Sequence, residues 1–327
     1  YDVIGTGSLL GVSGYHTNAS SEAPIPVGYE TIIDMYPMDF EEWLWANGIK
    51  KMTIDYLHRC LEEKTPVQEA IHERMRQLLL QYCIVGGMPR AVSIFMETHN
   101  MQNVLRMQQA IIEEYKVDML KYAPQADKSR IRECFESIPR QLSKENKKFA
   151  YATVRSNGRG RDYQGSLQWI EDAGIIRRCY NLSAPELPLD GNSIPDQFKV
   201  YMADTGLFIS MLEPGTAADI LQGNLYGYKG AIFENLVADI FGKMNRKLYY
   251  FRKDSGLEID FVTRYEGKCT LVEVKASNGN IKSAKTILSN PEKYHVSQAI
   301  KLGDVNVETA PQTLILPLYM AFLLKNK

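Results

Sequence analysis

The chain has 327 residues, 45% of them hydrophobic, so it is long enough for two or three domains with buried cores, and its composition argues against disorder. Its 38 basic and 39 acidic residues nearly cancel, which excludes an overall basic field for nucleic-acid binding and leaves only local patches. Five cysteines without a C-x-x-C pair fit a reduced, cytoplasmic protein better than a secreted disulfide scaffold.

The first stretch, Tyr1–Ser8 (YDVIGTGS), reads as an apolar strand that ends in small polar residues, as strands that line ligand crevices do. Because the chain begins with Tyr inside such a strand, we expect a truncated longer protein; a processed chain that folds as it stands is the alternative. A loop over 13–26 and a weak strand over Tyr29–Met35 follow. Asp39 is predicted to cap the next helix.

The pattern from Ile54 to Tyr122 is helical. It predicts one helix over Val67–Tyr82, stopped by the Gly-Gly-Met-Pro sequence at 86–89, and a second over Met101–Leu120. These helices are typical of a lid over an ATPase core and equally of plain helical packing, and both interpretations stay open.

Residues 127–180 are typical of a winged helix. We expect helices over Lys128–Leu142 and Arg161–Ala173, then wing strands over Ile175–Leu182 and Phe198–Met202. This is the most basic segment of the chain, and its cationic residues could meet DNA phosphates. Domain–domain contact or a solvated charged face is the alternative. The residues are Arg155, Arg159, Arg161, Arg177 and Arg178, with Lys147 and Lys148.

Three elements near the end of the chain carry acids. A helix over Ala231–Gly242 places Glu234 at the edge of its apolar stripe, where a glutamate alone is usually a surface residue. A strand over Leu257–Val262 alternates, with Leu257, Ile259 and Phe261 on one face and Asp260 on the other.

The next strand, Cys269–Lys275, puts Glu273 and Lys275 on one face. Carboxylates together with a lysine suit a Mg²⁺ ion and a phosphate. The chain closes with a predicted helix over Ile281–Leu288 and strands over His295–Leu302 and Thr313–Leu324; the last is too short to span a membrane, and no signal peptide is recognisable.

The order GAIFENLVADIF, LEIDF, LVEVKAS resembles the PD-(D/E)XK restriction-endonuclease-like superfamily. With YDVIGTGS, YPMDFEEWL, FAYATV, LQWIEDAGII and FKVYMADTGLF, nearly the whole chain is similar to prokaryotic AAA+ family ATPases that carry an uncharacterised C-terminal domain of that nuclease-like type.

The resemblance implies an α/β fold. Its parts would be a remnant of a parallel ATPase sheet over 1–45, a helical lid-like region over 46–125, a winged helix over 126–212, and a restriction-endonuclease-like mixed sheet flanked by helices over 213–327. It assigns Glu234, Asp260 and Glu273 as ligands of Mg²⁺. The catalytic residues would be Asp260, Glu273 and Lys275, and Ser8 would occupy the ATP sensor position. The phosphate loop G-x-x-x-x-G-K-[ST] and the Walker B acids are missing from the sequence, so ATP binding belongs to the full-length protein.

Two functions therefore follow from the sequence. In the first, the chain is part of an AAA+ ATPase that acts on DNA through a Mg²⁺-dependent nuclease domain. In the second, the nuclease fold serves as a binding or regulatory module of the ATPase that contacts DNA or protein without cutting. A chance acid and lysine on an ordinary strand is the plainest interpretation. DNA and the missing ATPase core are the expected partners, homo-oligomers stay open, and no membrane contact is expected.

Overall fold

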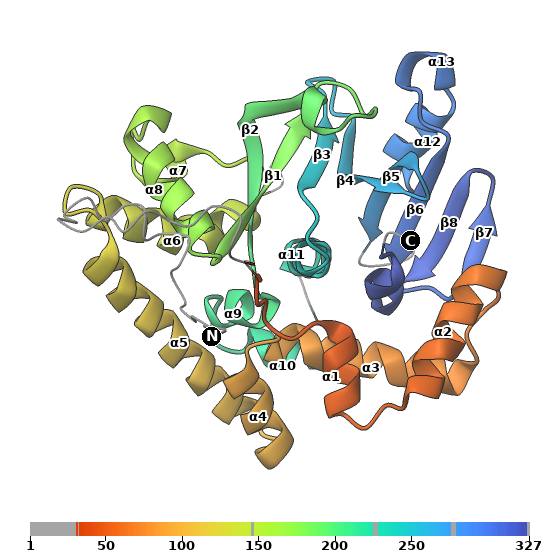
Figure 1. Ribbon diagram of the computed structural model, residues 1–327, viewed down its shortest axis with the longest axis horizontal. Coiled ribbons are helices and arrows are strands. Elements are labelled where there is room, and N and C mark those ends of the chain that lie inside the picture. The colour runs from red at the N-terminus through yellow and green to blue at the C-terminus, as the bar shows by residue number, and fades with distance from the viewer. Residues whose placement is uncertain (1–30, 32, 145–146, 225–227, 276–278, 326–327) are drawn as a thin grey trace.

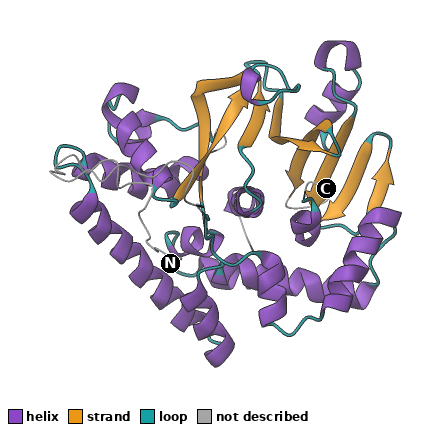
Figure 2. Cartoon of the chain, viewed as in Figure 1, coloured by secondary structure: helices purple, strands orange, loops and turns teal. Residues whose placement is uncertain are grey.

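The computed structural model describes residues 31, 33–144, 147–224, 228–275 and 279–325. The fold is mixed α/β, as the sequence predicts. Figure 1 shows the helices of the first half below and to the left of a sheet that carries most of the second half, and Figure 2 shows the same division by secondary structure.

The first half is almost entirely helical, because apolar residues recur at helical spacing and Gly or Pro separates the segments. Its helices are α1 Phe40–Ala46, α2 Lys51–Glu63, α3 Glu69–Val85, α4 Pro89–Thr98, α5 Met101–Tyr122, α6 Lys128–Leu142, α7 Tyr151–Val154 and α8 Gly160–Asp172. The later helices are α9 Thr205–Ser210, α10 Thr216–Gln222, α11 Lys229–Lys243, α12 Lys282–Leu288 and α13 Pro291–Tyr294, with 3₁₀ turns η2 Asp190–Asn192 and η4 Leu318–Leu323.

In the described residues one mixed sheet has the strand order β2-β1-β3-β4-β5-β6-β8-β7. Neighbours β1/β3, β5/β6 and β6/β8 run parallel, and the other pairs are antiparallel. The strands are β1 Ile176–Leu182, β2 Ser193–Met202, β3 Leu248–Arg252, β4 Glu258–Tyr265, β5 Lys268–Lys275, β6 Gln298–Gly303, β7 Glu308–Ala310 and β8 Thr313–Pro317.

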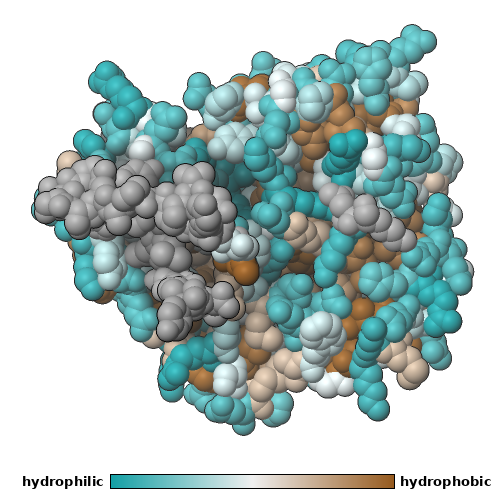
Figure 3. Space-filling view, viewed as in Figure 1, coloured by the Kyte–Doolittle hydropathy of each residue, from teal (hydrophilic) through white to brown (hydrophobic). Residues whose placement is uncertain are grey.

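Helices cover both faces of this sheet. Along β5, Val272 belongs to the core shared with α11 and the first-half helices, whereas Leu271 belongs to a second core shared with α12 and α13. Successive side chains of a strand point to opposite faces, so the centre of the sheet is buried on both sides. On the face of the molecule drawn in Figure 3, hydrophilic side chains cover most of the surface, with apolar areas between them.

Several sequence predictions are confirmed. The strands expected over Ile175–Leu182 and Phe198–Met202 pair antiparallel as β1 and β2, and α5, α6, α8, α11 and α12 form close to the expected ranges. Strand β1 also pairs with β3, so the sheet continues across the boundary drawn between residues 212 and 213.

Other predictions need correction. The strand expected over Thr313–Leu324 ends at Pro317, and η4 follows, because proline has no N–H to continue a ladder. Pro89, which was expected only to stop a helix, also begins α4, since proline suits the first helical position. The strand expected from His295 begins at Gln298, after α13. Residues 31 and 33–35 are not extended strand, and the rest of the Tyr29–Met35 prediction lies outside the described residues.

The predicted alternation of the strand over Leu257–Val262 is wrong at its centre. Tyr249 pairs with Val262 and Phe251 with Ile259, so two residues of β4 lie opposite one residue of β3, which is a β-bulge. Ile259 therefore packs in the second core and Phe261 in the first. Asp260 does not face solvent either: its side chain is 13% exposed, because helices cover both faces of the sheet.

Buried hydrogen bonds fix the helical half to the sheet. Asp204, which precedes α9, accepts hydrogen bonds from the N–H groups of Gly87 (2.7 Å) and Leu207 (2.9 Å). Asp239 of α11 accepts from the Thr205 N–H (3.2 Å) and pairs with Lys243 (2.9 Å). These bonds set the position of α11, on which part of the candidate site lies.

Candidate functional site

Helix α11 is the centre of the candidate site. Every residue from Ala231 to Gly242 is buried, because the helix packs between the sheet, at β5 and β2, and the short helices α9 and η4. A helix that is buried on all sides is typical of a protein interior. Glu234 is a buried acid on this helix, and it must therefore be compensated by partners from neighbouring elements.

Glu234 has two lysine partners and a tyrosine partner. Lys147, from the segment between α6 and α7, donates a hydrogen bond to one carboxylate oxygen. The Tyr201 hydroxyl donates to the other oxygen (3.1 Å), and the Lys199 ammonium lies 3.7 Å from it. Burial alone would raise the pKa of Glu234, but the charges of Lys199 and Lys147 lower it below its ordinary value.

Asp260 lies where β4 and β5 adjoin. Its carboxylate accepts a hydrogen bond from the Val274 N–H (2.8 Å) and lies 3.8 Å from the Lys275 ammonium. Burial, together with the charges of Glu234 and Glu273, raises the pKa of Asp260 to about 7. The four residues assigned by the resemblance therefore share one electrostatic cluster.

Glu273 and Lys275 lie on the same face of β5, as the sequence predicts. The Lys275 ammonium donates a 2.7 Å hydrogen bond to Glu273. Burial would lower the pKa of Lys275, but the charges of Asp260 and Glu273 raise it. Lys275 is therefore a charged partner of both acids.

Four residues that sequence reasoning did not assign to this site belong to it: Lys147, Lys199, Tyr201 and Glu258. Lys199 of β2 has a side chain only 1% exposed, and its ammonium lies 2.8 Å from Glu258 of β4. Lys147, taken from the sequence as part of a basic DNA-binding segment, instead pairs with Glu234. The one available signal was Lys199 itself, the single charged residue in the otherwise apolar stretch Phe198–Met202.

The cluster does not fit a resident Mg²⁺ ion. Its carboxylate oxygens are the right kind of ligand. However, the acids lie against the ammonium groups of Lys147, Lys199 and Lys275 instead of around a common centre. Among the residues that the structure describes, no group of three His, Cys, Asp or Glu side chains is arranged to hold a metal ion.

The structure separates the five arginines predicted to bind nucleic acid. Arg155 and Arg161 have side chains 73% and 74% exposed, and Arg159 between them is also exposed, at the turn from α7 to α8. Arg178 is held inside by Glu171, and Arg177 packs over the ring of Tyr36 (4.9 Å). Ser8, assigned to the ATP sensor position, lies outside the described residues.

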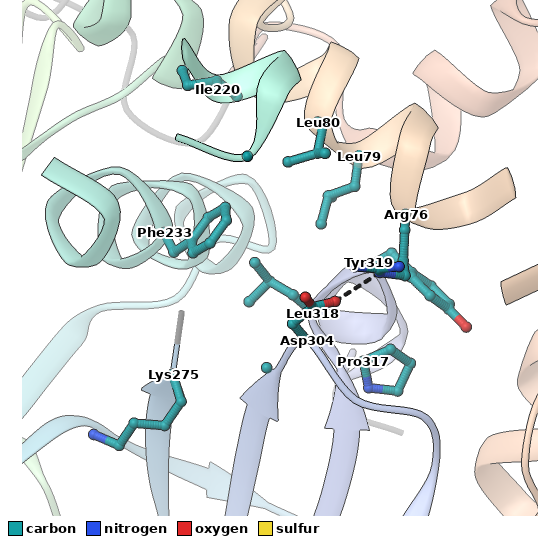
Figure 4. A pocket seen from close by; sticks show the side chains of 12 residues that line it. Arg76, Leu79, Leu80, Ile220, Phe233, Lys275, Asp304, Pro317, Leu318 and Tyr319 are labelled. Atoms are coloured by element: carbon teal, nitrogen blue, oxygen red, sulfur yellow. Dashed lines mark ion pairs between the residues drawn. The ribbon is translucent and has the colours of Figure 1, made fainter. Parts of the chain in front are cut away.

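A cavity of about 120 Å³ adjoins the carboxyl ends of the parallel strands β5, β6 and β8. Figure 4 shows Leu79, Leu80, Phe233 and Leu318 around it, with the ammonium of Lys275 directed away. Arg76 at its rim is paired with Asp304 (2.7 Å). The cavity is mainly apolar, and the two cations that line it are each paired with an acid, Arg76 with Asp304 and Lys275 with Glu273.

Two family models match the chain. One, described as a domain of unknown function (DUF8612), matches residues 76–217, and the other, also a domain of unknown function (DUF4143), matches residues 229–320. Glu234, Asp260, Glu273 and Lys275 lie in the second matched region, whereas Lys147 and Lys199 lie in the first. No curated protein and no solved structure matches the chain. In the part of the chain that the structure describes, no helix combines the length and apolar character needed to cross a membrane.

Proposed function

We propose that this chain works with an AAA+ ATPase core as a module that binds DNA without cutting it, built on a PD-(D/E)XK-like sheet. The DUF4143 match supports the ATPase association, because this domain is often found in AAA-ATPase-associated proteins. ATP binds the ATPase core, and the described chain supplies the DNA contact.

The observation that carries the non-cutting function is the pairing of the acids with lysines. Lys147 and Lys199 neutralise Glu234, and Lys275 neutralises Glu273. A nuclease of this type needs carboxylates that are free to hold a metal ion, which then activates water. Here the lysines already supply the positive charge at the acids.

The turn between α7 and α8 is the proposed DNA contact. Arg155, Arg159 and Arg161 project there from a short segment, and exposed guanidinium groups pair well with phosphate oxygens. The near-neutral chain needs such a local patch, because its net charge of −1 gives no long-range attraction for DNA.

The test is replacement of all three arginines by alanine, followed by fluorescence anisotropy with a labelled DNA duplex across a range of salt concentrations. We expect weaker binding and a salt dependence reduced by roughly one unit of slope for each lost phosphate contact. Arg74, Arg106 and Arg264 are exposed on α3, α5 and β4, so their triple alanine variant is a control with the same change in charge. Equal affinity of the two variants would refute the assigned surface, and absence of binding by the wild-type protein would refute DNA binding.

A second candidate function is Mg²⁺-dependent cleavage of DNA. One observation favours it: Glu234, Glu273 and Lys275 all act electrostatically on Asp260, so the four motif residues share one cluster. Incubation of plasmid DNA with wild-type protein and MgCl₂ or MnCl₂ separates the two functions. Cleavage that is lost in Asp260→Ala and Lys275→Ala would overturn the non-cutting proposal.

A further inference from the structure

The charges of the acid cluster come from both family-matched regions. The acids Glu234, Glu258 and Asp260 lie in residues 229–320, whereas two of the lysines that face them, Lys147 and Lys199, lie in residues 76–217. Strand β2 brings Lys199 to the acids because β2, β1, β3 and β4 are successive neighbours in the sheet.

Lys199 is enclosed by negative charge and by an aromatic ring. Its ammonium lies 2.8 Å from Glu258, 3.7 Å from Glu234 and 4.8 Å from the centre of the Tyr250 ring. Burial of an ammonium is costly unless anions compensate it. The compensation is mutual. Without Lys199, the buried Glu234 would keep only Lys147, and Glu258, whose side chain is 27% exposed, would keep only Arg252 at 3.4 Å.

We infer that Lys199, with Lys147, is the permanent cation of this acid cluster and takes the place that a divalent metal ion has in nucleases of similar motif. The cluster is then an electrostatic joint between the two family-matched regions. This inference rests on the non-cutting function proposed above and extends it by naming the groups that make the cluster independent of metal.

The inference predicts that removal of a lysine creates a need for metal. Lys199→Met keeps an apolar stem of similar length but leaves Glu234 and Glu258 without this counter-ion. We expect the melting temperature of the wild-type protein to be insensitive to MnCl₂. That of Lys199→Met should be lower in the absence of metal and should rise with MnCl₂ by about 5 °C at concentrations well above the dissociation constant.

Two further variants make the result specific. Lys247→Met removes a surface lysine, 75% exposed, from its pair with Asp190, and should give no response to Mn²⁺. Adding Glu234→Gln to Lys199→Met removes one acid of the cluster and should abolish the response. If Lys199→Met does not fold, Lys147→Met provides the same measurement, because it removes the other lysine partner of Glu234.

A Mn²⁺-induced shift in the wild-type protein would overturn the inference, because the acids would then accept metal with both lysines in place. Lack of response in both lysine variants would also overturn it, because the acids would then not require a cation. Neither result depends on DNA, so the inference and the DNA-binding proposal can fail separately.

Discussion

Asp260→Asn keeps the shape of the side chain and an oxygen that can accept the 2.8 Å hydrogen bond from the Val274 N–H, but it removes the negative charge. Burial and the charges of Glu234 and Glu273 oppose that charge and raise the pKa of Asp260 from 3.8 to about 7. We therefore expect the substitution to stabilise the protein at neutral and higher pH.

The magnitude follows from proton linkage. A carboxyl group whose pKa is raised in the folded state does not change the free energy of unfolding at pH values below its unfolded pKa. As pH rises, it lowers the free energy of unfolding increasingly, and the loss is complete above the folded pKa. A shift of about three units corresponds to about 4 kcal/mol as an upper bound. The raised pKa already includes the attraction of Lys275 at 3.8 Å, but the variant buries an amide NH₂ group whose desolvation offsets part of the gain, so we expect a net gain of about 2 kcal/mol at pH 8.

Urea unfolding of the wild-type and variant proteins between about pH 5 and pH 8 measures this gain. The difference in the free energy of unfolding should grow from pH 5 to pH 7 and then level off. Asp254→Asn, at an exposed residue just before the same strand, should change the free energy by less than about 0.5 kcal/mol at each pH. A pH-independent difference for Asp260→Asn, or destabilisation at pH 8, would refute the reasoning.

Three further substitutions, one of them a control, test the framework that positions the site, all by urea or thermal unfolding. A Cβ added at Gly206 would lie 2.5 Å from Gln108 and 2.6 Å from the backbone N of Gly86. Gly206→Ala should therefore lower the free energy of unfolding by about 3 kcal/mol. As a control, Gly165→Ala, in open space on α8, should raise it by up to about 1 kcal/mol. Asp39→Ala removes the capping box of α1 and should cost about 1 kcal/mol; equal stability would mean that the cap does not hold α1.

The common face of Glu273 and Lys275 could be predicted from the sequence because its signal is local. Glu234 was assigned only through the resemblance, and the alternation that oriented Asp260 is broken by the bulge in β4. The spacing of Glu273 and Lys275 fixes a common face whichever way the strand is turned, and the structure pairs them at 2.7 Å. The apolar positions of α11 likewise predicted a helix with one buried face, but not its burial on all sides. Such patterns need only neighbours in sequence to be interpreted correctly.

The remaining features depend on contacts between distant parts of the chain. Lys147 and Glu234 are 87 positions apart, and no local pattern indicates that they pair. The bulge in β4 arises from its register against β3, which the sequence of β4 alone does not show. The parallel pairing of β1 with β3, which brings the wing strands into the main sheet, is non-local in the same way.

Residue types alone therefore do not decide the chemistry of a motif such as Glu234, Asp260, Glu273 and Lys275. What decides it is the source of the neighbouring positive charge. Carboxylates that face water can bind a metal ion, whereas carboxylates paired with lysines already have a counter-charge. Because Lys199 lies on β2 in the first matched region and Glu258 on β4 in the second, their pairing requires both regions to fold together. We therefore expect the same acids on a sheet that lacked β2 to be left without the charge of Lys199, which is the state that Lys199→Met reproduces.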